Sequence, residues 1–93
     1  MNEPIWIQRR SGKVPILEYD RNEHFCWHKN PQGGWSVTHI KSGLLMADIK
    51  SRRNAKSMAD MLVILPGWDV EDIQADEELK KKTETIIEYW SGI

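Results

Sequence analysis

The sequence predicts a small α+β domain in which two helices pack on an antiparallel sheet. Between Trp35 and Leu65 the spacing of apolar residues changes from every second residue to about every 3.6 residues, which is the change from strand to helix. Turn-forming residues separate the strand-like segments, and a second helical pattern lies near the C-terminus. We therefore expect a sheet of three to five strands within one domain over residues 1–93.

Length and composition set the class of protein. A chain of 93 residues has room for one small core, and its 40% hydrophobic and 29% charged residues are typical of folded domains. The single cysteine cannot form an internal disulfide, and no apolar run approaches the roughly 20 residues that span a bilayer. The N-terminus also lacks the basic and apolar stretch of a signal peptide. We expect a cytoplasmic protein that has no membrane anchor.

The N-terminal residues predict a β-hairpin over about residues 5–17. Apolar residues alternate with polar ones on both sides of the turn dipeptide Ser11-Gly12. Pro15 cannot donate a backbone hydrogen bond, which favours an edge position for the second strand. The charged stretch from Glu18 to Glu23 is interpreted as a loop.

A three-stranded meander is expected over about residues 24–49. Its strands are predicted at residues 24–28, 35–40 and 44–49, with connections at Asn30 to Gly34 and at Lys41 to Gly43. Pairing Trp27 with Val37 and Val37 with Ala47 collects the apolar residues on one face. The residues expected to point inward are Phe25, Trp27, Trp35, Val37, His39, Leu45, Ala47 and Ile49. Those expected to point outward are His24, Cys26, His28, Ser36, Thr38, Ile40, Leu44, Met46 and Asp48.

Two helices are predicted, at about residues 52–65 and 77–90. Ser51 is the expected N-cap of the first helix, and Pro66-Gly67 is expected to end it. Asp76 is the expected cap of the second helix. The expected buried stripes are Ala55, Met58, Ala59, Leu62 and Leu65 in the first helix, and Leu79, Thr83, Ile86, Ile87 and Trp90 in the second.

Residues His24, Cys26 and His28 alternate on one strand and offer thiolate and imidazole, which are typical zinc ligands. However, residues four apart in a strand are separated by roughly 13 Å, and a structural zinc site usually has four protein ligands. The sequence also has no CxxC pair, nucleophile elbow or nucleotide-binding glycine motif. We therefore expect no enzyme, metal or cofactor, and keep metal- or thiol-dependent activity at these residues as a third hypothesis.

Net charge is divided unevenly along the chain. Residues 1–58 hold ten Lys or Arg against five Asp or Glu, whereas residues 59–93 hold three against nine. Cations at the start of the first helix lie beside the positive end of the helix dipole, which is unfavourable for stability and therefore suggests a functional role. Together with the free backbone N–H groups of the first turn, they are suited to binding phosphate. Nucleic-acid binding is therefore the alternative function, and its predicted residues are Arg9, Arg10, Lys13, Lys50, Arg52, Arg53 and Lys56.

From His24 to Leu65, the order of three strands and a helix resembles the ethylene-response-factor and integrase-type DNA-binding domains. The resemblance implies that the outward sheet face would enter the major groove of DNA. In those families that face carries Arg, Lys and Trp, whereas here it is weakly polar to apolar and includes Asp48. The resemblance is therefore one of architecture, and no family membership follows from it.

Apolar residues on the outward face favour a protein partner. Ile40, Leu44 and Met46 would form an exposed apolar patch. Either the hairpin or the last helix covers this patch, or a protein partner does, and of the two we expect cover by the chain itself. Trp68 lies in an acidic link and is a second candidate anchor. The function predicted first is a small non-enzymatic module that binds a protein partner through Ile40, Leu44, Met46 and Trp68, an accessory or inhibitory factor like those of phages and mobile elements.

Overall fold

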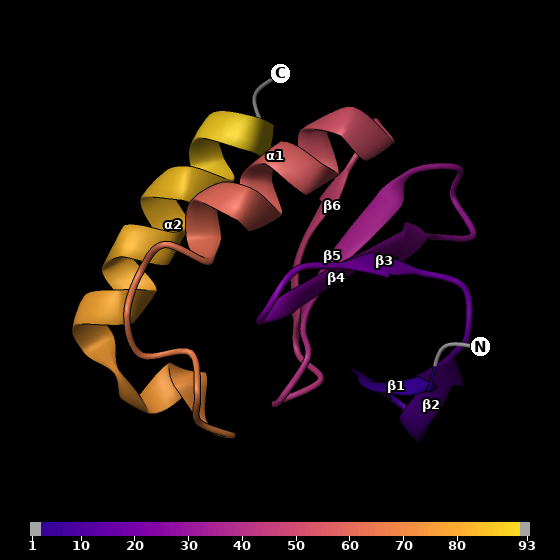
Figure 1. Ribbon diagram of the computed structural model, residues 1–93, viewed down its shortest axis with the longest axis horizontal. Helices are drawn as coiled ribbons and strands as arrows, with labels where there is room; N and C mark the ends of the chain where they lie inside the picture. Colours follow the sequence, from indigo (N-terminus) through magenta and orange to yellow (C-terminus); the bar gives the residue numbers. More distant parts are fainter. Residues whose placement is uncertain (1–2, 92–93) are drawn as a thin grey trace.

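Four antiparallel strands form the central sheet in the computed structural model, which describes residues 3–91. Their order is β3 (Asp20–Arg21), β4 (Phe25–Lys29), β5 (Trp35–His39) and β6 (Leu45–Ile49), so β3 and β6 are the edge strands (Figure 1). The predicted α+β class and the meander are confirmed. The expected loop at residues 18–23 was wrong in part, because Asp20 and Arg21 pair with Trp27 and Cys26. Charged residues of this kind suit a short, solvated edge strand.

The register of the sheet follows the prediction over most of its length. Trp27 lies opposite Val37, Val37 opposite Ala47, and Trp35 opposite Ile49. This pairing places Phe25, Trp27 and Val37 in one buried cluster beneath the helices. The aromatic face of the meander therefore points into the core.

A β-bulge in β6 changes the expected orientation of two leucines. Thr38 pairs with Leu45, although Val37 pairs with Ala47, so Met46 is the extra residue on this strand. The backbone N–H of His39 donates to the carbonyl of Leu44 at 3.0 Å. Leu44 consequently packs against the core, whereas Leu45 is 52% exposed. The predicted inward position of Leu45 and outward position of Leu44 were therefore wrong, and so was the outward position predicted for Met46, which also packs against the core.

Two helices cover the inner face of the sheet (Figure 1). Helix α1 (Arg52–Leu62) begins after Ser51, whose hydroxyl accepts from the backbone N–H of Asn54 at 3.2 Å. It ends three residues before the expected boundary, since Val63 is its C-cap and the indole of Trp68 donates to the carbonyl of Leu62 at 2.6 Å. A short 3-10 helix, η1 (Ile73–Ala75), precedes α2 (Glu77–Ser91). A carboxylate oxygen of Asp76 accepts from the N–H of Leu79, as predicted for a cap.

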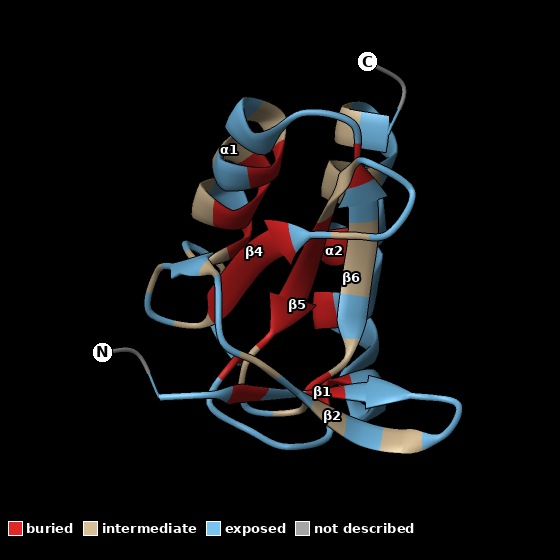
Figure 2. Cartoon of the chain, turned by 90° about the vertical axis from the view of Figure 1, so that its right-hand side faces the viewer, coloured by how far each residue is buried: buried red, intermediate tan, exposed pale blue. Residues whose placement is uncertain are grey.

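The N-terminal hairpin covers part of the outer face. Strands β1 (Ile5–Arg9) and β2 (Gly12–Ile16) form a separate two-stranded sheet, and Figure 2 shows it lying across one end of the central sheet. Ile5 and Ile7 pack on Cys26 in a second buried cluster, which Ile40 joins. The N–H of Gln8 donates to the carbonyl of Gly43 at 2.8 Å. Strand β4 is therefore buried on both faces, and the expected intramolecular cover of Ile40 is provided by the hairpin.

Gly43 allows the hairpin to approach this closely. Its φ is +75°, a conformation that residues with a Cβ rarely adopt, and an added Cβ would lie 2.7 Å from the carbonyl oxygen of Trp6. A side chain at this position would push the hairpin away from the connection between β5 and β6.

Candidate functional site

Two residues of the metal or thiol hypothesis, Cys26 and His28, lie on the outer face of β4, and the third, His24, directly precedes the strand. Cys26 is fully buried, and burial raises the pKa of its thiol to about 11. His28 is 2% exposed, whereas His24 is half-buried beside the carboxylate of Glu23. Among the described residues, no group of three His, Cys, Asp or Glu is placed to hold a metal ion. The site therefore offers a protonated thiol beneath the hairpin, and the geometry gives the third hypothesis no support.

A polar row crosses the sheet beside this thiol. His28 lies opposite Ser36, and Ser36 lies opposite Asp48 on the next strand. The hydroxyl of Ser36 donates to a carboxylate oxygen of Asp48 at 2.7 Å. A serine nucleophile instead donates its proton to a general base such as histidine. The row therefore has the residue types of a hydrolytic triad without its hydrogen-bond order.

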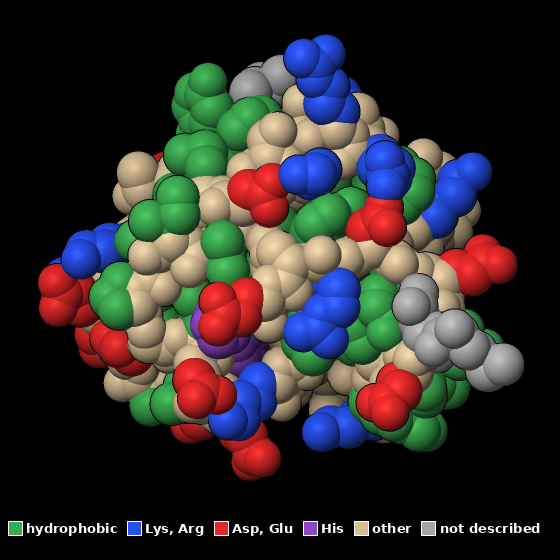
Figure 3. All heavy atoms as spheres, in the orientation of Figure 1, with side chains coloured by type: hydrophobic (Ala, Val, Ile, Leu, Met, Phe, Trp, Pro, Cys, Tyr) green, Lys and Arg blue, Asp and Glu red, His purple; other side chains and the backbone are tan. Residues whose placement is uncertain are grey.

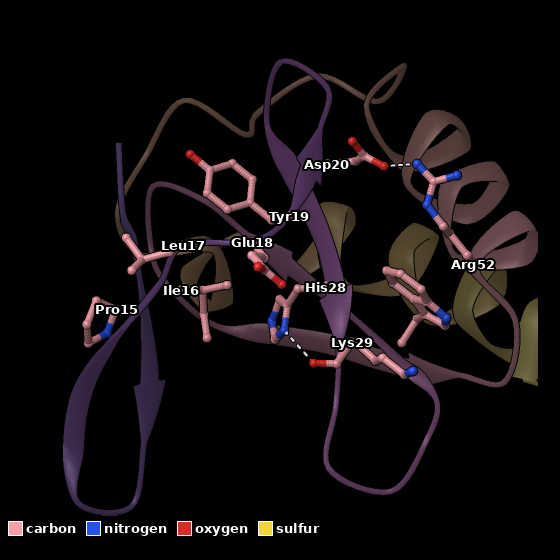
Figure 4. A pocket seen from close by; sticks show the side chains of 10 residues that line it. Pro15, Ile16, Leu17, Glu18, Tyr19, Asp20, His28, Lys29 and Arg52 are labelled. Atoms are coloured by element: carbon pink, nitrogen blue, oxygen red, sulfur yellow. Dashed lines mark hydrogen bonds and ion pairs between the residues drawn. The ribbon is translucent and has the colours of Figure 1, made fainter. Parts of the chain in front are cut away.

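An open cleft of about 670 Å³ lies between the residues that follow β2 and the start of α1. Figure 4 shows Asp20 and Arg52 paired across one side of it, with the ring of His28 in its wall. Burial lowers the pKa of His28, whose Nδ1 lies 3.3 Å from the carbonyl of Lys29. The lining has two acidic and two basic side chains, contributed by Glu18, Asp20, Lys29 and Arg52. Because these opposite charges cancel, the lining of the cleft favours neither an anion nor a cation.

The residues predicted for nucleic-acid binding lie at two exposed places, the hairpin tip and the start of α1. At the helix, Arg52 pairs with Asp20 and lies over the ring of Trp35, while Lys56 lies 2.7 Å from a carboxylate oxygen of Asp60. The remaining predicted cations are exposed, namely Arg9, Arg10, Lys13, Lys50 and Arg53. Two of the four cations at the helix start are thus held by carboxylates of the chain itself, which reduces the positive charge offered to phosphate.

A groove of about 250 Å³ lies between β6 and α2. Three of the four residues predicted to bind protein line it, namely Leu44, Met46 and Trp68. Trp68 is 1% exposed and forms part of its buried base, whereas Ile40 packs with the hairpin cluster elsewhere. The other lining residues are Leu45, Ile73, Gln74, Leu79, Lys80, Thr83, Glu84 and Ile87.

Sequence reasoning singled out none of these other lining residues for binding, and Thr83 differs from the rest in carrying a buried polar group that is unpaired within residues 3–91. It is 6% exposed, and its hydroxyl has no hydrogen-bond partner among the described residues. The helical pattern predicts that Thr83 is buried, but the pattern alone cannot show that α2 places this residue at a groove beside the sheet edge. A buried hydroxyl without a partner is unfavourable for folding.

Comparisons with known proteins give no relative for this fold or groove. The chain matches no family model, no curated protein and no solved structure. Within residues 3–91, no helix is long and apolar enough to cross a membrane.

Proposed function

We propose that this protein is a small non-enzymatic binding module that takes an apolar segment of a partner protein into the groove between β6 and α2. The observation that carries this proposal is the groove itself, which lies beside an edge strand and is lined mainly by apolar side chains. Such a module would act as an accessory or inhibitory factor in the cytoplasm.

Burial in this groove would provide useful binding energy. Leu45 is 52% exposed at the rim, and because about half of its side chain is already covered, burying the rest contributes roughly 1 kcal/mol. Interfaces of this kind concentrate their energy in a few apolar anchors at the centre, with polar residues around them. Lys80, Glu84 and Gln74 supply the polar residues of the lining.

Capture from a lysate of the native host cells, with and without nuclease, tests the proposal. We expect a captured protein that survives nuclease treatment and is lost with the variant Leu45→Glu. The matched control is Leu17→Glu, because Leu17 is also exposed but lines the cleft on the hairpin side. Equal capture by both variants, or capture that depends on nucleic acid, would contradict the proposal and favour the basic residues instead.

A further inference from the structure

Strand β6 leaves one edge of the central sheet without a neighbour. It is the last strand in the order β3-β4-β5-β6, and Figure 2 shows it at the border of the sheet, with most of its residues coloured as exposed or intermediate. An edge strand presents backbone N–H and C=O groups to any extended chain that comes alongside. Of the residues in β6, Leu45 and Met46 also line the groove. Backbone bonding and side-chain insertion are therefore available to one ligand at the same place.

Thr83 contributes the opposite wall of the groove and carries an unpaired hydroxyl beneath its surface. This hydroxyl comes from α2 and is the buried polar atom of the groove that has no partner among the described residues.

Charge near the groove indicates the composition of that segment. Residues 69–78, which run from the end of the buried Trp68 into the first turn of α2, include six carboxylates and no Lys or Arg. Figure 3 shows acidic side chains gathered at the lower left, where Figure 1 places this segment and the start of α2. Asp69 is engaged by Lys41 at 2.7 Å, and Lys80 lies in the groove wall, so the excess of negative charge comes mainly from Glu71, Asp72, Asp76 and Glu77. Interfaces match such a surface with positive charge.

We infer that the partner segment is an extended chain with apolar residues at every second position and Lys or Arg at its ends, and that it adds as a strand to β6. This inference rests on the proposed function and specifies its ligand. Strand addition explains affinity through backbone hydrogen bonds, while the groove selects the alternate side chains. The acidic segment favours basic ends.

Three peptides of one length test the mode and the charge. The basic peptide KVKVTVK is compared with the neutral TVTVTVT and with a form of KVKVTVK methylated at alternate backbone nitrogens. We expect the basic peptide to bind about fivefold more tightly than the neutral one at low salt, and methylation to abolish binding. Equal affinity of the basic and neutral peptides, undiminished binding of the methylated peptide, or no binding by any of them would overturn the inference.

Variants of the protein separate this inference from the proposed function. The double change Glu71→Lys and Asp72→Lys is expected to weaken binding of KVKVTVK about fivefold, while Glu18→Lys with Glu23→Lys, the same change in net charge elsewhere, leaves it unaltered. If Leu45→Glu abolishes lysate capture but both charge variants bind the peptide equally, the inference fails and the proposed function stands.

Discussion

At the scale of single residues, Cys26 shows how burial decides chemistry. Its thiol is fully buried and has its pKa raised to about 11 by burial, so the nucleophilic thiolate is scarce at neutral pH. We predict that the native protein reacts with a thiol reagent such as dithionitrobenzoate only as fast as it opens. Labelling followed at pH 8 with and without urea checks this. Rapid stoichiometric labelling of the native protein would restore the thiol hypothesis.

Two buried histidines predict a loss of stability on mild acidification. Burial lowers the pKa of both His28 and His39 from the ordinary value of 6.5. A histidine of this kind binds its proton less well when folded, so protonation of the unfolded chain below pH 6.5 favours unfolding. The free energy of unfolding by urea should therefore be lower at pH 5.5 than at pH 7.5.

The variant His28→Gln is expected to lose part of this pH dependence. A free energy of unfolding that is constant or rises on acidification would contradict the assignment of buried, neutral histidines.

Trp68 joins the segment between the helices to the rest of the core. Its indole donates to the carbonyl of Leu62, its own carbonyl accepts from Nε2 of His39 at 2.7 Å, and its ring meets Phe25 edge to face. Trp68→Phe removes the first of these bonds and leaves a space, so we expect a loss of about 2–4 kcal/mol in unfolding free energy. The control Trp6→Phe, at a residue that is 52% exposed, should change it by less than about 0.5 kcal/mol. Equal changes in denaturant midpoint would show that Trp68 is not a core anchor.

At the scale of elements, the bulge in β6 makes two adjacent leucines unequal. Leu44 packs against the core, and Leu45 points to solvent between the groove and a hollow beside the hairpin. We expect Leu44→Ala to cost about 1–3 kcal/mol of stability and Leu45→Ala less than about 0.5 kcal/mol. Chemical denaturation of the two variants measures the difference. A larger loss at Leu45 would mean that the strand pairs without a bulge.

The same strand shows where sequence reasoning succeeds and where it stops. Alternation of apolar residues specifies the pairing of Trp27 with Val37 and of Trp35 with Ile49, because a shift of one residue would expose the aromatic face. The bulge at Met46 leaves no comparable pattern, since Leu44, Leu45 and Met46 are all apolar and suit either face. Three of the predicted binding residues nevertheless line one groove, and finding that groove required the placement of α2 against β6.

At the scale of the whole molecule, the uneven division of charge is partly neutralised within the fold. Lys41 of the basic half pairs with Asp69 of the acidic half, and Lys56 pairs with Asp60 across the boundary between them. Much of the remaining negative charge lies between the helices and at the start of α2, close to the groove. The arrangement therefore combines an apolar groove, an unpaired sheet edge and an acidic border on one side of the protein.

Photocrosslinking from the groove tests this account most directly. A photoreactive phenylalanine in place of Leu45 should form a specific crosslink to a protein partner in host cells, and the same residue in place of Leu17 should not. Identical crosslinked products from both positions, or a partner reached only from Leu17, would contradict the claim that the groove between β6 and α2 is the binding site.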